Sequence, residues 1–271
     1  CFRRPSQREL VCPARPACSR AASDAPPWAR AALNSPAGNS WTETNHDLSA
    51  PTGLTDAGDL VLPPDERARA LIEAGVRSVL EAGNRPIALG GDHAVTYPAV
   101  RAVAAHHPGL TIVHIDAHTD LYEDFEGDRY SHACPFARIM EAGLASRLIQ
   151  IGIRTQTGHL RQQAERFGVE VITMDRWVEG VRPRPEGAVY WSIDLDGIDP
   201  GAAPGVSHRE PGGLSVREVI TLIHELGGTM VGADVVEYNP REDLGGMTAV
   251  VAAKLVKELA GRIMSEASPQ S

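Results

Sequence analysis

The sequence predicts one α/β domain in which helices cover both faces of a mainly parallel sheet, so that three layers form. Short apolar runs rich in β-branched residues alternate with amphipathic stretches, which is the order of parallel strands joined by helical crossovers. The 271 residues are 42% hydrophobic and 23% charged, so the chain can bury one large core. We expect residues 1–50 to form an irregular N-terminal segment and residues 51–265 to form the folded domain.

The expected elements follow one another along the chain. A helix over 65–82 begins after Pro63 and Pro64 and ends before Gly83, which are ordinary start and stop signals. The apolar run 86–89 predicts a short strand, and the helix that follows it over 97–105 stops before a Pro-Gly pair. Apolar, largely β-branched runs predict strands near 111–116, 148–152, 169–173, 189–194 and 230–235, with helices over 215–226 and 249–263.

Two of these strands run into clusters of side chains that commonly bind metals. Residues 116–120 (DAHTD) follow the run near 111–116, and residues 192–196 (SIDLD) close the run near 189–194. Side chains alternate along a strand, so Asp116, His118 and, where the chain stays extended, Asp120 point one way, as do Asp194 and Asp196. We expect these donors to converge, because open α/β sheets place their sites at the carboxyl ends of strands.

His93 is a third contributor, since it follows the run 86–89 and two glycines that let the backbone turn tightly. The resulting six donors exceed what one zinc ion needs, because a catalytic zinc takes about three protein ligands and a water. The sequence therefore predicts two ions, and the oxygen-rich set favours manganese, with nickel or cobalt as other candidates. A solvated loop is the alternative for any single run, but the same context recurs at all three.

The three runs resemble the signature runs of the ureohydrolases, the arginase and agmatinase family. They read GGDH at 90–93, DAHTD at 116–120 and SIDLDGIDP at 192–200, and the resemblance covers roughly residues 54 to 262. The strings APGVSH at 203–208, EPGGL at 210–214 and GADVVEYNP at 232–240 are similar to plant-type arginases. The resemblance implies an arginase-like three-layer α/β/α fold with a mainly parallel sheet of about eight strands, and a ureohydrolase domain over 51–265.

By this resemblance the protein is a binuclear manganese hydrolase that cleaves the guanidino group of arginine or agmatine to urea and an amine, ornithine or putrescine. The ligands it implies are His93, Asp116, Asp120 and Asp194 for one ion, and Asp116, His118, Asp194 and Asp196 for the other. A guanidinium carbon is a poor electrophile because three nitrogens share its charge, so a concentrated nucleophile beside a pair of metal ions suits the reaction.

The resemblance also implies which side chains handle the substrate. Glu237 matches the family carboxylate that grips the planar guanidinium, and His132 matches a histidine that binds substrate and moves protons near neutral pH. Asp120 completes the expected catalytic set. His208, next to Arg209, is a candidate for a substrate contact that would read the carboxylate of arginine, against the alternative of a solvated loop. His114 is either a partner of Asp116 or a core histidine.

Charge and length limit the classes of partner. A net charge of −9 with no basic stripe argues against nucleic acid and suits a small cationic substrate. The apolar runs are far shorter than the roughly 18 residues of a membrane span, so no membrane partner is expected. Family resemblance implies a homo-oligomer, a trimer or hexamer. Residues 1–23 hold five arginines against one glutamate, so we expect a mitochondrial or plastid location if they act as a transit peptide, and a cytoplasmic one otherwise.

Alternatives to this function stay open in the sequence. Residues 1–59 do not match the first strand and loop that the family uses beside its substrate, which is compatible with a non-catalytic homologue that acts as a subunit or regulator. Leu121 and Tyr122 replace polar residues with which animal arginases read the α-carboxylate, so agmatine, which lacks that carboxylate, stays open. Another guanidino or formimidoyl substrate is a further alternative. A hydrolase that uses one zinc ion is disfavoured, because Asp120 and His93 would then have no role.

Overall fold

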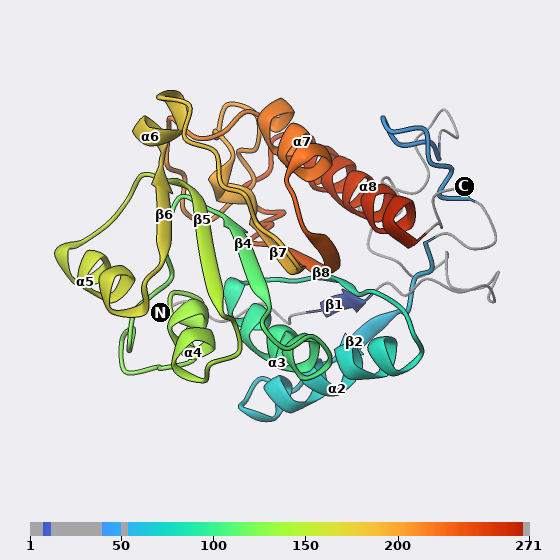
Figure 1. Cartoon of the computed structure of the whole chain (residues 1–271), viewed down its shortest axis with the longest axis horizontal. Helices are drawn as coiled ribbons and strands as arrows, with labels where there is room; N and C mark the ends of the chain where they lie inside the picture. The colour runs from blue at the N-terminus through green and yellow to red at the C-terminus, as the bar shows by residue number, and fades with distance from the viewer. Residues whose placement is uncertain (1–7, 12–39, 50–53, 268–271) are drawn as a thin grey trace.

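The structure is a computed structural model, and it describes residues 8–11, 40–49 and 54–267. Most of the expected N-terminal segment, including residues 1–23 apart from the strand at 8–11, lies outside the described residues. The described part forms one sheet between two layers of helices (Figure 1), so the predicted three-layer α/β/α fold is confirmed.

The sheet has the strand order β2-β1-β3-β8-β7-β4-β5-β6. From β3 to β6 all neighbouring strands are parallel, whereas β1 pairs antiparallel with both β2 and β3. The predicted mainly parallel sheet is therefore confirmed: six consecutive strands pair in parallel, and among the described strands β1 alone runs against the others. The strands are β1 Arg8–Val11, β2 Asp59–Val61, β3 Ile87–Leu89, β4 Thr111–Ile115, β5 Arg147–Ile153, β6 Glu170–Thr173, β7 Ala188–Asp194 and β8 Thr229–Val236.

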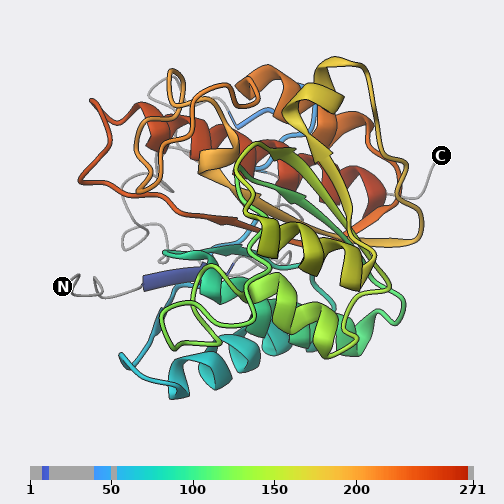
Figure 2. The same cartoon turned by 90° about the vertical axis from the view of Figure 1, so that its left-hand side faces the viewer.

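Helices pack on both faces of this sheet. In Figure 2 the blue-green helices α2 and α3 lie on one side and the orange-red helices α7 and α8 on the other. Within the described ranges, no helix is both long and apolar enough to span a membrane. The helices are α2 Arg67–Glu81, α3 Thr96–His106, α4 Pro135–Glu141, α5 Gly158–Phe167, α6 Met174–Val178, α7 Val216–Glu225 and α8 Met247–Ala267, with short 3₁₀ helices η2 His93–Val95 and η3 Leu195–Gly197.

Alternation along the strands divides the core into two layers. In β4, Val113 and Ile115 pack into the cluster that includes residues of α7 and α8, whereas Ile112 packs into the cluster that includes residues of α2, α3 and α4. All three side chains are fully buried. This burial on both faces is the reason that the strands read as continuous apolar runs in the sequence.

The order of the strands decides where the polar loops meet. Strands β3, β8, β7 and β4 are consecutive and parallel, so their carboxyl ends lie along one edge of the sheet. Leu89 pairs with Val235, Ile193 with Val235, and Ile115 with Ile193, which aligns the four ends. Each expected metal ligand, and also Glu237, lies within a few residues of one of these ends.

Three helices were not predicted from the sequence. Helices α4 and α6 contain 7 and 5 residues, so they are too short to show several turns of apolar periodicity, and α5 (GHLRQQAERF) has too few apolar residues to show one. Local signals nevertheless mark α5, because the Thr157 side chain accepts a hydrogen bond from the Leu160 backbone and Gly168 ends the helix at a φ of 63°.

Candidate metal centre

The loop after β4 places three of the expected ligands by turning sharply. The Asp116 Oδ1 atom accepts a hydrogen bond from the His118 backbone N at 2.6 Å, which folds the chain back on itself. Asp120 follows with a φ of 48°, in the left-handed region. The extended conformation considered for 116–120 was therefore wrong, because the Asp116 side chain closes a turn instead, but the three side chains still converge.

The loop after β7 is joined to the β4 loop. Asp194 ends β7 and caps η3, since its Oδ1 accepts a hydrogen bond from the Asp196 N at 2.8 Å. Asp196 Oδ1 in turn accepts one from the Ala117 N at 3.1 Å. A Cβ on Gly197 would lie 2.8 Å from the Asp116 N, so only glycine lets the two loops approach this closely.

His93 forms a first group of donors with three aspartates. It lies on η2, just after β3, and its ring is fully buried. His93 Nδ1 is 3.3 Å from Asp116 Oδ2, 3.1 Å from Asp120 Oδ2 and 3.1 Å from Asp194 Oδ2. Three strands and one turn thus bring one imidazole nitrogen and three carboxylate oxygens to a common point.

His118 forms a second group with the other oxygen of Asp116. His118 Nδ1 is 3.4 Å from Asp116 Oδ1 and 3.1 Å from Asp196 Oδ2. Asp116 therefore faces each histidine with a different oxygen, which is the geometry of a carboxylate that can bridge two ions. All six residues predicted as ligands lie in one or both groups.

The concentration of carboxylates shifts their ionisation. Burial, with the charges of Asp196 and Asp116, raises the pKa of Asp194 well above its ordinary value, and burial with Asp116 raises the pKa of Asp196 to about 7. Burial opposes a charge on His118, but hydrogen bonds with Asp116 and Asp196 outweigh it and raise the pKa of His118 to about 12. This pattern indicates a site that needs added positive charge.

The donor set fits divalent cations. Among the described side chains, His93 Nδ1 is a buried polar atom with no hydrogen-bond partner, although three carboxylate oxygens face it. Buried carboxylates and imidazoles are costly unless a cation or a full set of hydrogen bonds satisfies them. Two groups that share Asp116 and contain mostly oxygen donors would satisfy two hard or borderline ions.

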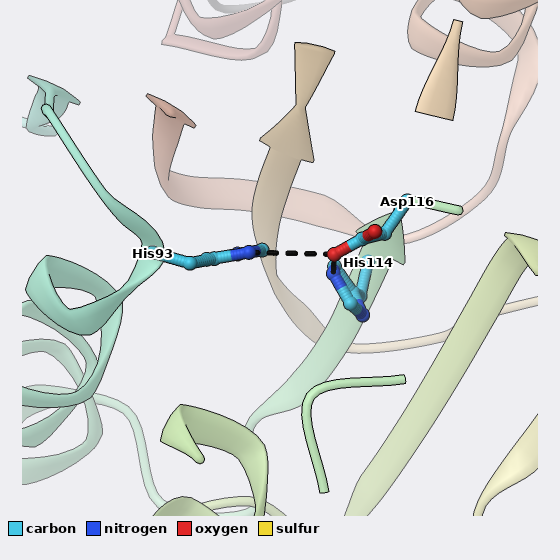
Figure 3. Close-up of side chains that lie close together, drawn as sticks. All are labelled: His93, His114 and Asp116. Atoms are coloured by element: carbon cyan, nitrogen blue, oxygen red, sulfur yellow. Dashed lines mark hydrogen bonds and ion pairs between the residues drawn. The ribbon is translucent and has the colours of Figure 1, made fainter. Parts of the chain in front are cut away.

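The His114 ring lies beside Asp116 (Figure 3), and both of its nitrogens already have hydrogen-bond partners. Its Nε2 lies 2.7 Å from Asp116 Oδ2, and its Nδ1 lies 3.0 Å from the Gln150 amide nitrogen. The same Gln150 nitrogen donates to the Thr119 carbonyl at 2.7 Å, so its second hydrogen is directed at His114 Nδ1. His114 therefore donates from Nε2 to Asp116. Gln150 was not predicted from the sequence, because it is a lone polar residue within an apolar strand.

Glu237 lies beside the first group of donors. It follows β8 with a φ of 64°, and its Oε1 accepts a hydrogen bond from the His93 backbone N at 2.8 Å. Burial, together with the nearby charge of Asp92, raises the pKa of Glu237 to about 8. A left-handed backbone costs a non-glycine residue about 1–2 kcal/mol, and such strain persists where the surroundings hold it.

His208 lies next to both His118 and His132. The His132 and His208 rings stack with their centroids 6.0 Å apart, and His208 is 6.1 Å from His118. Burial and the neighbouring His118 lower the pKa of His208. Arg209 donates instead to the Pro204 carbonyl and to Glu242, so its guanidinium is already engaged.

Arg154 is a second residue that sequence analysis missed. Its guanidinium donates to the carbonyls of Asp196 at 2.6 Å and Glu210 at 2.5 Å, and also to those of Gly152 and Gly197. It thereby ties the loop of His208 to the loop of a predicted metal ligand. An arginine after a strand has no local signal for this role, because all its partners are backbone atoms.

The chain is similar to known proteins both in sequence and in structure. The model of the family described as Arginase family matches residues 16–261. Arginase 1, mitochondrial, of Arabidopsis thaliana is 48% identical over 257 residues, which are 88% of this chain and 75% of that protein. Agmatinase of Bacillus anthracis is 37% identical over 212 residues, covering 75% of this chain and 73% of that protein. The solved arginase from Medicago truncatula is similar with a TM-score of 0.78 and 43% identity, covering 88% of this chain and 80% of that one.

Proposed function

The chain belongs to the arginase family, and from this we propose that it is a ureohydrolase that cleaves the guanidino group of arginine or agmatine. The products are urea and an amine, which is ornithine from arginine and putrescine from agmatine. The observation that carries the proposal is the pair of histidine–aspartate groups that share Asp116, with the Glu237 carboxylate beside one of them. The relatives include both arginases and an agmatinase, so the substrate proposal keeps both compounds.

The family is metal-dependent, and we assign the two donor groups to two manganese ions. His93, Asp116, Asp120 and Asp194 would hold one ion, and Asp116, His118, Asp194 and Asp196 the other. The predominance of oxygen donors favours manganese over zinc, and nickel or cobalt could bind the same set. A pair of such ions, when bound, lowers the pKa of water so that hydroxide is available near neutral pH.

Glu237 is the residue assigned to bind the substrate guanidinium. Its two oxygens match the fork of N–H donors on that group, and a charge-assisted pair of hydrogen bonds also orients the group. A bound cation would favour the ionised form of Glu237, which burial disfavours. This carboxylate would therefore select a cationic substrate and hold it beside the first group of donors.

His132 is assigned to move a proton to the departing amine, and His208 to line the path of the substrate beyond it. The leaving nitrogen cannot depart as an anion, so an imidazole that can give up a proton suits this step. The ring contacts support this assignment, because His208 lies beside both His132 and His118. Since Arg209 is engaged with Glu242, a carboxylate of arginine would meet His208 rather than Arg209.

The remaining proposals concern the whole protein. We propose that residues 51–265 form the catalytic domain and that the protein assembles as a trimer or hexamer, as the family resemblance implies. Plant relatives of this chain are named mitochondrial arginases, and we propose the same compartment here.

The test is urea release by the full chain loaded with Mn²⁺. Arginine, agmatine, guanidinobutyrate and guanidine are offered separately under the same conditions. We expect urea from arginine or agmatine, and its loss in His118→Ala. His106→Ala is the matched control, because His106 is an exposed histidine away from the donor groups. A chain that binds Mn²⁺ but releases no urea from any of the four compounds would overturn the proposal and favour a non-catalytic homologue.

A further inference from the structure

A buried cluster of polar side chains lies behind His93, on the side away from the aspartates. It consists of Asp234 on β8, Tyr190 and Ser192 on β7, and Thr96 at the start of α3, and all four residues are buried. Asp234 Oδ1 accepts a hydrogen bond from Ser192 Oγ at 2.7 Å. Asp234 Oδ2 accepts one from Tyr190 OH at 2.8 Å and one from Thr96 Oγ1 at 2.9 Å.

The direction of these hydrogen bonds follows from the number of protons available. A carboxylate can only accept, and a serine hydroxyl has a single proton, which Ser192 gives to Asp234. The Ser192 oxygen must then act as an acceptor toward its other neighbour, His93 Nε2, at 2.9 Å. Nε2 is therefore the protonated nitrogen of His93, and Nδ1 is the nitrogen that faces the three aspartates.

Packing alone does not distinguish the two orientations of the His93 ring. The His93 ring contacts Phe136 edge to face, with centroids 5.3 Å apart, and His114 at 5.0 Å. These contacts restrict the plane of the ring, but a rotation by a half turn about the Cβ–Cγ bond leaves the outline of an imidazole almost unchanged. Such a flip would turn Nδ1 away from the aspartates and put a carbon in its place. Only a directional partner such as Ser192 distinguishes the two orientations.

We propose that Asp234, acting through Ser192, fixes the proton of His93 on Nε2 and so directs its Nδ1 lone pair at the metal site. Asp234 and Ser192 are positioning residues in this proposal, since neither faces the donor groups. The inference deepens the proposed function, because it rests on His93 being a metal ligand. It also accounts for a carboxylate at 0% exposure, which an apolar residue would replace at lower cost if the position served packing alone.

The cluster supplies its own controls for the test. Ser192→Ala breaks the chain between Asp234 and His93, whereas Thr96→Val and Tyr190→Phe each remove one hydroxyl from Asp234 Oδ2 and leave that chain intact. Mn²⁺ dissociation constants are measured on the full chain by calorimetry, with thermal unfolding of the metal-free proteins alongside. We expect Ser192→Ala to weaken Mn²⁺ binding roughly 10–100-fold, as loss of a partner behind a metal ligand does, and the controls by less than about threefold.

Thermal unfolding separates positioning from packing, since all three variants lose one buried hydrogen bond and should unfold at similarly lowered temperatures. The inference is overturned if Ser192→Ala binds Mn²⁺ as tightly as the wild type, or if the two controls weaken binding as much as Ser192→Ala does. It is also overturned if the wild-type chain binds no Mn²⁺. If the wild type binds Mn²⁺ but releases no urea, the proposed function fails while this inference still stands.

Two further measurements test whether Asp234 acts through Ser192 and which nitrogen of His93 carries the proton. Asp234→Asn is made in the wild type and in Ser192→Ala, and we expect its effect on Mn²⁺ binding to disappear in the second background, because the connection to His93 is already broken. An undiminished effect there would contradict a route through Ser192. In nitrogen-15 spectra of the diamagnetic Zn²⁺-loaded protein, the His93 Nε2 should carry the proton, and a proton on Nδ1 would refute the assignment.

Discussion

Replacing Glu237 by glutamine should change stability and activity in opposite directions. Glu237 has its pKa raised from 4.5 to about 8 in the fold. One pKa unit corresponds to about 1.4 kcal/mol. At pH 7 the Glu237 side chain is ionised in the unfolded chain but protonated in the folded one, and this difference lowers the free energy of unfolding of the metal-free protein by roughly 3 kcal/mol. The residue retains some exposure although its carboxylate is enclosed by protein, and solvent screening lowers the expected gain from Glu237→Gln to about 2 kcal/mol.

The pH dependence gives the sign of this effect. A carboxyl group whose pKa is higher in the fold than in the unfolded chain contributes its full stability at low pH and loses it as the pH rises toward 8. Glutamine does not titrate, so the variant and the wild type should be nearly equal at pH 4.5 and diverge up to pH 8. The amide oxygen of glutamine can still accept the hydrogen bond from the His93 backbone, so that contact is retained.

The assay is urea unfolding of the metal-free full chain at several pH values, with turnover of the Mn²⁺-loaded protein measured in parallel. Glu126→Gln is the matched control, because Glu126 is exposed but has the same left-handed backbone, with a φ of 54°. We expect no measurable change there. For Glu237→Gln, loss of the charged partner of a guanidinium should lower kcat/KM by roughly 100-fold or more, within the 2–5 kcal/mol of a broken charge pair. A Glu237→Gln variant that is less stable than the wild type at pH 8, or that keeps full activity, would contradict this prediction.

Three other results are expected. Mn²⁺ affinity should rise by about tenfold per pH unit for each proton displaced. His118 and Asp196, with pKa values of about 12 and about 7 without metal, must lose their protons before they can bind the ion. Calorimetry in buffers of different ionisation enthalpy counts these protons, and an affinity that does not depend on pH would contradict this prediction. Gln150→Leu should lower the free energy of unfolding by about 1–3 kcal/mol, because it leaves the buried His114 Nδ1 and the Thr119 carbonyl without their hydrogen-bond donor. An unchanged midpoint of chemical unfolding would refute this prediction. Glu258→Ala should lower the free energy of unfolding by about 1–3 kcal/mol, because the partly buried Lys254 and His224 and the Glu43 backbone N lose the fully buried carboxylate that accepts from them. Thermal unfolding within error of the wild type would show that these contacts contribute nothing.

The metal-binding residues could be predicted because they lie in short stretches of consecutive residues. The runs at 116–120 and 192–196 follow apolar strands, and the strand period states which side chains share a direction. The parallel sheet could be predicted for a similar reason, since strands that are buried on both faces are apolar throughout. The short helices α4 and α6 were missed, because 7 and 5 residues span too few turns for a periodic pattern.

The supporting residues could not be predicted from such patterns. Gln150 meets His114 from a neighbouring strand 36 positions along the chain, and Ser192 meets His93 across 99 positions. Arg154 binds only backbone carbonyls, which carry no residue identity to recognise. A side chain whose partner is distant in sequence has no local periodicity, capping residue or spacing that reveals it.

The sequence by itself determined which donor side chains exist and that each group of them follows a strand, because residue type and alternation are local properties. Tertiary structure alone decided that β3, β8, β7 and β4 are neighbours, so that His93, Glu237, Asp194 and Asp116 reach the same edge. It also decided that His114 donates to Asp116 rather than offering a nitrogen to a metal. The physical reason is that strand order and hydrogen-bond direction depend on the packing of distant segments, which a local pattern does not contain.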